Sequence, residues 1–251
     1  MHDRVSPEAP AQREDLLVTT SASSLVYAML DGWRRQMVEH GRELLDAAVR
    51  RAERIRAAIA ELPGPRPMGR EIVEEGLAAD LDPLKIVIDV RKLGLSGMQA
   101  VEWLHVHRHV DVGGSDSCSI SASITHADDD ETEEILLDAL RALVEHADSV
   151  ERRPPVRLPE PSVLELEQAM LPRAAFFAPV EHVPADRAAG RIAAETISPC
   201  PPGVPVVAPG EVITDAVLDY LRSGAEHGVL IPDAADSSVR TLRVVARAEQ
   251  P

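Results

Sequence analysis

Apolar residues recur along the chain with two different periods, and these periods predict its helices and strands. From Ser24 to Glu61, apolar residues such as Leu25 and Met29 return every three or four positions, which predicts one long helix or a pair of helices. Residues 118–125 alternate instead between small or apolar side chains and hydroxyl-bearing ones. That period of two predicts a strand with one buried face and one polar face.

The same patterns predict further elements on both sides of a proline-rich stretch. Before it, we expect strands at residues 85–90 and 109–112 and helices at residues 98–107 and 131–146. After it, we expect a strand at residues 241–246 and helices at residues 162–170, 185–195 and 213–222. This order is typical of an α/β or α+β module followed by a second, smaller α/β domain.

Composition divides the chain into four parts. Residues 1–17 are charged and contain proline, so we expect a disordered tail. Residues 18–150 and 162–251 carry the patterned segments and are expected to form two folded parts. Between them, residues 151–161 end a stretch rich in Pro and Arg that starts at Asp148, and we predict an interdomain linker there.

The chain is strongly acidic, with 42 Asp and Glu against 26 Lys and Arg and a formal net charge of −16. Because phosphate contacts supply most nucleic-acid affinity, we expect no nucleic-acid partner. An anionic membrane surface repels such a chain as well, and the sequence has no apolar run long enough to span a bilayer. The N-terminus lacks the apolar core of a signal peptide. We therefore expect a cytoplasmic protein in which Cys118 and Cys200 are reduced thiols.

Two side-chain clusters allow a metal-binding interpretation and a plainer one. On a strand, His105, His107 and His109 would share one face and could hold a metal, but the pattern before them favours a helix end, where histidines are solvated. The acidic run at residues 128–134 lacks the glycine and the ligand spacing of a calcium loop. It stands where a helix is predicted to begin, which is a favourable place for carboxylates. We therefore predict no metal site in either cluster.

A cluster of hydroxyl groups stands directly before the long helix, at Thr19, Thr20, Ser21 and Ser23. Hydroxyls together with the unpaired N–H groups of a helix N-terminus can bind an anion such as phosphate. The same residue types are also the usual helix N-caps. From the residues alone, capping is the favoured interpretation and an anion site is the alternative.

Several short segments carry more specific signals, in one order along the chain. Residues 19–24 are T-T-S-A-S-S, residues 82–88 are D-P-L-K-I-V-I, and residues 170–177 are M-L-P-R-A-A-F-F. Residues 190–195 are G-R-I-A-A-E, and residues 199–211 contain P-C-P-P-G-V-P and P-G-E. Together these segments resemble motifs of the bacterial ornithine/lysine/arginine decarboxylases, pyridoxal-phosphate enzymes of the aspartate-aminotransferase fold type.

The resemblance implies a fold and a set of site residues. Residues 18–150 would hold the end of the large domain and an aminotransferase-like small domain, and residues 162–251 the decarboxylase C-terminal domain. Thr19 and Ser21 would contact the phosphate of pyridoxal 5'-phosphate (PLP) held by a neighbouring subunit. The family's Schiff-base lysine lies upstream of the matched part, and Lys85 resembles a strand lysine of the family instead. We therefore assign no catalytic residue to this chain.

Two functions follow from the resemblance. The first is PLP-dependent decarboxylation of arginine, lysine or ornithine, with this chain as the C-terminal portion and inactive alone. The alternative is a non-catalytic assembly or regulatory subunit that pairs with a full-length decarboxylase. Ala22, Ser24 and Cys200 stand where the family motifs have a proline and two tyrosines. The expected partners are a second copy of this chain or a full-length or upstream decarboxylase subunit, together with a basic amino-acid substrate.

Overall fold

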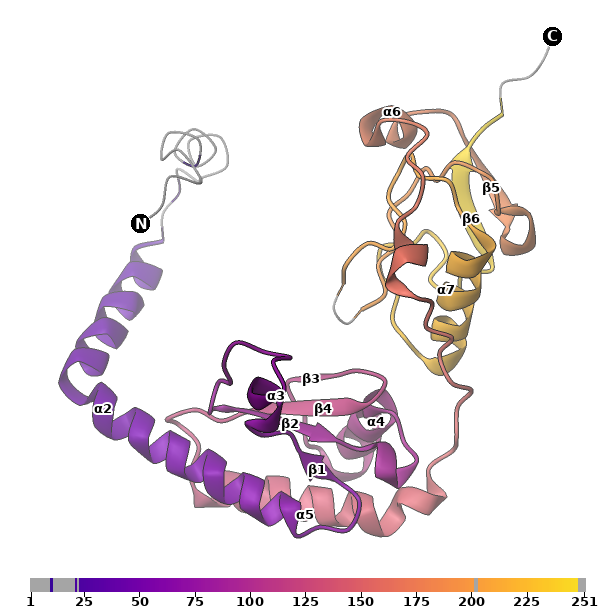
Figure 1. Cartoon of the computed structure of the whole chain (residues 1–251). Coiled ribbons are helices and arrows are strands. Elements are labelled where there is room, and N and C mark those ends of the chain that lie inside the picture. The colour runs from indigo at the N-terminus through magenta and orange to yellow at the C-terminus, as the bar shows by residue number, and fades with distance from the viewer. Residues whose placement is uncertain (1–9, 11–20, 22, 201–202, 248–251) are drawn as a thin grey trace. The chain divides into compact units, whose positions relative to one another are not determined.

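The computed structural model of the chain describes residues 10, 21, 23–200 and 203–247. Its contacts divide the chain into two units, residues 1–47 and residues 48–251. Helix α2 (Ser24–Ala60) begins in the first unit and ends in the second (Figure 1). It confirms the long helix that the apolar spacing predicts.

The second unit contains a four-stranded antiparallel sheet with the order β1-β2-β4-β3. Its central strands pair so that Ile88 lies opposite Ile120 and Ile86 opposite Ala122, and all four side chains are buried. The predicted alternation is confirmed, because the serines of β4 lie on the other, less buried face. The strands are β1 (Arg66–Pro67), β2 (Lys85–Asp89), β3 (Gly114–Ser115) and β4 (Ser119–Ser123).

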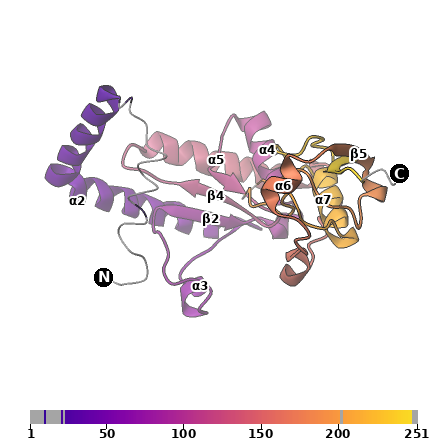
Figure 2. The ribbon, with the colours of Figure 1, turned by 90° about the horizontal axis from the view of Figure 1, so that it is seen from above.

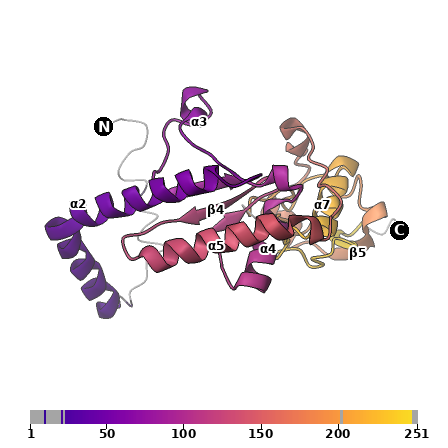
Figure 3. The same cartoon turned by 90° about the horizontal axis from the view of Figure 1, so that it is seen from below.

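Helices cover the apolar face of this sheet. Figure 3 shows α5 (Asp130–His146) and the last turns of α2 running lengthwise along the strands. The third covering helix is α4 (Gly97–Arg108), which contacts both β4 and α5. The resulting core has no aromatic residue among its fully buried side chains; the largest of them are Ile55, Ile59, Ile86, Ile88, Leu104, Ile120, Leu140 and Leu143. We call this part, residues 48–150, the sheet domain.

A second core lies farther along the chain, in what we call the C-terminal domain (residues 162–247). Its antiparallel strand pair is β5 (Val180–Pro184) with β6 (Thr241–Val245), and α7 (Asp215–His227) packs beside it (Figure 2). Ile213, Leu221 and Leu242 are buried in this core. The chain is thus a mixed α+β protein, as the order of predicted elements indicates.

The remaining elements are short. They are the helices α3 (Glu71–Glu74) and α6 (Pro172–Phe176) and the 3-10 turns Arg91–Leu93, Ala147–Ser149, Pro161–Leu164 and Ala185–Arg187. The periodicity argument missed α3, α6, β1, β3 and β5, because elements of two to five residues are too short to show a period. No helix in the described ranges is both long and apolar enough to cross a bilayer.

The strand predicted at residues 109–112 is wrong. His109 ends α4 in the left-handed conformation, with φ of 53°, so the chain turns there and does not extend. The edge strand that pairs with β4 is instead β3, two residues farther along. A run of alternating residues that is only four long is too weak a signal to overrule a helix end.

The helices predicted at residues 162–170 and 185–195 are also wrong. Each segment keeps only one 3-10 turn, Pro161–Leu164 and Ala185–Arg187. The remaining residues pair with distant backbone, for example Gln168 with Glu211 and Ala193 with Val244. These pairings satisfy backbone groups and bury Ala193, so tertiary structure overrides the helical spacing.

A carboxylate fixes the tight loop that leads into β6. Asp236 accepts hydrogen bonds from the backbone N–H of Ser238 at 3.0 Å and of Thr241 at 2.9 Å, and from both of their hydroxyls. Val239 inside the loop is buried and has a φ of 53°, which a branched side chain adopts only when its surroundings impose it. These hydrogen bonds, that of the Ser238 hydroxyl first, lower the pKa of Asp236 from 3.8 to about 2.

The lowered pKa predicts a pH-dependent contribution to stability. Because the folded pKa lies below the unfolded one, the stabilisation is present above about pH 4 and is lost as the pH falls toward 2. We expect Asp236→Asn to lower the free energy of unfolding at pH 7 by about 1 kcal/mol, allowing for solvent screening. Urea unfolding at pH 7 and pH 3 measures this, with the exposed Asp186→Asn as the control. An equal deficit of Asp236→Asn at both pH values would contradict the assignment.

Candidate functional site

Two residues of the hydroxyl cluster, Ser21 and Ser23, lie directly before α2. Ser23 caps the helix, because its Oγ accepts the backbone N–H of Val26 at 3.4 Å and its carbonyl accepts the N–H of Tyr27 at 3.2 Å. Ser21 is exposed directly before the first turn, whereas Thr19 lies outside the described residues. The capping interpretation is therefore confirmed for Ser23. A phosphate contact by Thr19 and Ser21 stays a prediction.

The first half of α2 presents large apolar side chains to solvent. Leu25, Tyr27, Met29 and Leu30 are 70%, 63%, 66% and 58% exposed, and Val38 is 75% exposed. Soluble proteins seldom leave contiguous apolar side chains in the open, and such a surface marks an interface. Ser21 thus stands at the beginning of a helix whose first half is not covered by other elements of the described chain.

The two lysines do not fit the role of a PLP-binding lysine. Lys85 Nζ donates a hydrogen bond to Ser123 Oγ at 2.8 Å on the polar face of the sheet, and the Lys85 side chain is exposed. Lys92 is exposed in the 3-10 turn after β2. An amine that forms a Schiff base is usually desolvated or placed beside another cation. Because neither lysine has such surroundings, we derive no reaction step through PLP from this chain.

The three histidines stand at the end of α4, which confirms the helix-end interpretation. His105 Nδ1 pairs with Asp111 Oδ1 at 2.6 Å, and His109 is the C-cap. The rings of His107 and His146 both pack against Trp103, with ring centroids 5.0 and 5.7 Å from its own. Within the described ranges, no three His, Cys, Asp or Glu side chains lie close enough together to hold a metal ion.

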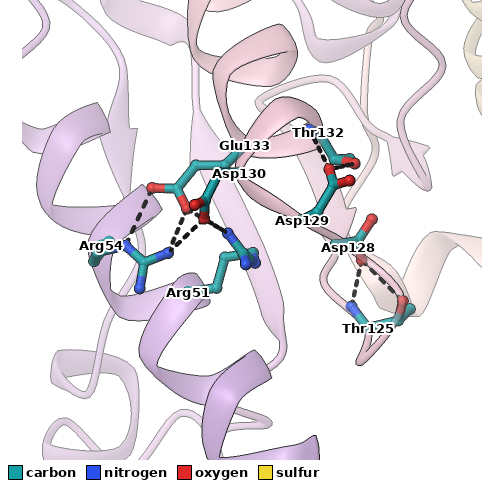
Figure 4. A network of polar contacts seen from close by, with 8 residues as sticks. All are labelled: Arg51, Arg54, Thr125, Asp128, Asp129, Asp130, Thr132 and Glu133. Atoms are coloured by element: carbon teal, nitrogen blue, oxygen red, sulfur yellow. Dashed lines mark hydrogen bonds and ion pairs between the residues drawn. The ribbon is translucent and has the colours of Figure 1, made fainter.

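The acidic run is occupied by helix capping and ion pairs, which confirms its position at a helix start. Asp129 is the N-cap of α5 and accepts the N–H of Thr132 at 2.9 Å. Figure 4 shows the next carboxylates facing two arginines of α2. Arg51 Nη1 lies 2.7 Å from Asp130 Oδ1 and 2.9 Å from Glu133 Oε2, which also binds Arg54 at 2.7 Å. The hydrogen bond from Arg51 lowers the pKa of Asp130.

In the C-terminal domain, two residues of the G-R-I-A-A-E segment hold the fold together. Arg191, only 10% exposed, donates to the carboxylate of Glu181 at 2.9 Å and to the carbonyl of Val245 at 3.0 Å. Glu195 is 4% exposed, and its carboxylate accepts the backbone N–H groups of Arg243 at 2.6 Å and Ala235 at 2.7 Å. A buried carboxylate needs such partners. The sequence did not reveal these roles, because the segment was expected to be helical.

The P-G-E segment is structural as well. Gly210 has a φ of 95°, and a Cβ there would lie 2.3 Å from the carbonyl oxygen of Met170, so only glycine fits. Its carbonyl accepts the N–H groups of Ala169 and Met170, and Glu211 accepts the N–H of Ala208 at 2.8 Å. These family-like residues therefore maintain the loops of the C-terminal domain.

Comparison with known proteins places these features in a family. A sequence profile described as "Orn/Lys/Arg decarboxylase, C-terminal domain" matches residues 161–234. The arginine decarboxylase of Halalkalibacterium halodurans is 35% identical over 235 residues, which are 93% of this chain and 48% of that protein. The arginine decarboxylase of Bacillus subtilis is 33% identical over 92% of this chain and 47% of its own length. The chain thus spans about half the length of these relatives.

Solved structures show the same fold. The constitutive lysine decarboxylase of E. coli superposes with a TM-score of 0.69 over 98% of this chain and 46% of that chain, at 19% identity. The Francisella novicida lysine decarboxylase LdcF gives a TM-score of 0.59 over 83% of this chain and 41% of its own. The chain therefore belongs to the Orn/Lys/Arg decarboxylases and corresponds to their C-terminal part.

Proposed function

We propose that this chain is the C-terminal part of a PLP-dependent decarboxylase of a basic amino acid. The N-terminal part of the enzyme would be supplied by another polypeptide or by a segment upstream of this one. The observation that carries the proposal is the match of 93% of the chain to an arginine decarboxylase about twice as long. When bound, PLP takes up the electron pair that remains after carbon dioxide leaves. The Schiff-base lysine comes from the missing portion, since Lys85 and Lys92 are both exposed.

This chain's own contribution is to bind and orient. Ser21 stands directly before the first turn of α2, where the helix dipole and hydroxyl groups favour a phosphate, and we propose that Thr19, two residues earlier in the sequence, contributes to the same contact. The sheet domain would serve as the aminotransferase-like small domain of the assembled enzyme. Arginine is the first substrate to test, because the relatives that match more than nine-tenths of the chain are arginine decarboxylases. The free thiols of Cys118 and Cys200 agree with a cytoplasmic location.

The alternative is a subunit that assembles with a full-length decarboxylase and has no activity of its own. Its support is the loss of two tyrosines and a proline from the family motifs at Ser24, Cys200 and Ala22. Cys200 stands in the backbone bridge to Leu230, at 2.7 Å from N to O, so the C-terminal domain keeps its fold without the tyrosine ring. Under this alternative the chain binds its partner and the activity of the partner does not depend on Ser21.

The first prediction from the proposed function separates it from the alternative. We expect the chain alone to release no carbon dioxide from arginine, lysine or ornithine. Mixed with the N-terminal half of a related arginine decarboxylase, it should form a complex that releases carbon dioxide from arginine. Borohydride reduction with PLP and peptide mapping should then find one pyridoxyl-lysine, on the partner. Decarboxylation by this chain alone, with stoichiometric label on Lys85 or Lys92, would overturn the proposal, and a complex without activity would favour the alternative.

The second prediction concerns the phosphate contact. In the active complex, Ser21→Ala should weaken PLP retention roughly tenfold, because a hydrogen bond to a charged group is lost. Ser23→Ala is the matched control: it removes the cap, which costs the helix up to about 1 kcal/mol, and should leave PLP retention nearly unchanged. Dialysis against buffer without PLP, followed by absorbance of the retained cofactor, measures both. Equal loss in the two variants would assign Ser21 to the helix and not to the phosphate.

The third prediction concerns the exposed half of α2. Because this half buries no apolar side chain by itself, we expect the chain to self-associate or to bind its partner through it. Met29→Glu should lower the association measured by sedimentation velocity, since it places a charge in the apolar contact. Leu77→Glu is the control, because Leu77 is 74% exposed and lies outside α2. A chain that stays monomeric with and without the N-terminal half would contradict the prediction.

A further inference from the structure

The segment between the two folded parts is bound to the sheet domain by two side-chain contacts at its beginning. Gln99 Nε2 in α4 donates to the carbonyl oxygen of Glu151 at 2.6 Å. Arg153 Nη2 donates to the carboxylate of Glu102, one turn farther along α4. We call residues 151–157 the strap; its course between α5 and the C-terminal domain can be followed in Figure 1.

The same strap is bound to the C-terminal domain by contacts at its other end. Arg157 pairs with both oxygens of Asp219 in α7, Nε to Oδ2 at 2.6 Å and Nη2 to Oδ1 at 2.7 Å. Its backbone N–H donates to Ser223 Oγ at 2.9 Å. Arg153 Nη1 reaches the carbonyl oxygen of His227 at 3.2 Å. One side chain, Arg153, therefore binds both domains.

Two adjacent arginines of the strap each close a helix end, one in each domain. Arg152 donates to the carbonyls of Leu93 and Gly94 at the end of a 3-10 turn, and Arg153 to the carbonyl that ends α7. Each of the two ends carries a glycine in the left-handed conformation, Gly94 with φ of 70° and Gly228 with φ of 99°. A Cβ would lie 2.9 Å from the Arg152 guanidinium at Gly94 and 2.6 Å from that of Arg153 at Gly228. A cationic side chain stabilises the C-terminal end of a helix, because it binds carbonyl groups that have no partner within the helix and lies at the negative end of the helix dipole.

A buried histidine joins strap and domains directly. His227 is 5% exposed, and its Nδ1 lies 2.6 Å from the carbonyl oxygen of Pro154. A carbonyl only accepts, so Nδ1 carries a hydrogen. The His227 Nε2 lies 2.8 Å from Ser96 Oγ, the side chain that caps α4. One ring nitrogen therefore contacts the strap and the other contacts the sheet domain.

From these contacts we propose that residues 151–157 and His227 form a latch that fixes the C-terminal domain to the sheet domain, so that the two move as one rigid body. The Pro- and Arg-rich composition by itself predicts only a spacer. Pro154 and Pro155 restrict the backbone of the strap. Its arginines donate hydrogen bonds to carbonyls and carboxylates of both domains. In an assembled enzyme, a displacement of the sheet domain would then carry the C-terminal domain with it.

The chain's two native cysteines provide the test. Cys118 lies in the sheet domain and Cys200 in the C-terminal domain, and both are free and partly exposed. Spin labels on both, diluted with unlabelled protein, report the distance between the domains by pulsed electron spin resonance. We expect one narrow distance distribution for the wild-type chain. His227→Ala should broaden it, because the loss of buried hydrogen bonds raises the open population roughly tenfold.

Trypsin gives a second readout on the same protein. The bonds after Arg152 and Arg157 are cleavable, whereas the bond between Arg153 and Pro154 resists trypsin. Since cleavage of a rapidly opening segment follows the open population, His227→Ala should accelerate strap cleavage by about the same factor of roughly ten. His182→Ala, an exposed histidine of the same domain, is the control and should change neither readout.

A second variant keeps the test decisive if His227→Ala does not fold. Arg153→Gln removes the side chain that binds both domains and leaves both cores intact. Arg187→Gln, an exposed arginine of the C-terminal domain, is its control. Circular dichroism checks the folding of each variant. A wild-type distance distribution that is already broad, or latch variants as narrow as their controls, would overturn the proposal.

Discussion

The fold of the sheet domain depends on covering a single face of its sheet. Ile86, Ile88 and Ile120 point to one side, and the helices α2, α4 and α5 exclude water from it. With aromatic residues at only 2% of the chain, this burial comes from aliphatic side chains, each contributing about 1.5–3 kcal/mol when fully buried. The opposite face, with Lys85 and the serines of β4, needs no cover.

Arginine side chains connect several pairs of elements. Almost all of the 26 basic residues are arginines, and several of them bind backbone carbonyls as well as carboxylates. Arg56 donates to the carbonyls of Pro83 and Lys85 at 2.8 and 2.6 Å, which ties α2 to the start of β2. A planar guanidinium with five donors can serve two acceptors at once, which a lysine ammonium does less well. In this acidic chain, a small number of arginines can therefore connect elements within both domains.

The residues that carry the family likeness in the C-terminal domain hold its loops in place. Arg191, Glu195, Gly210 and Glu211 satisfy buried backbone groups or permit a close approach, and they lie among short isolated bridges. A domain made of such loops cannot rely on long helices or strands for its backbone hydrogen bonds. Side chains must replace them, because buried N–H and C=O groups need partners.

By itself, the sequence determined the elements whose period is long enough to read: α2, α5, α7, β2, β4 and β6 all lie within a few residues of their predicted bounds. It also indicated the family, through short segments in a characteristic order. Only the tertiary structure decided that residues 162–170 and 185–195 are not helical, and that Glu195 is a buried acceptor. It alone showed that Arg152 binds the sheet domain and that Arg153 binds both domains. The physical reason is that period and propensity are local, whereas the partner of a backbone carbonyl or of a buried charge lies far away along the chain.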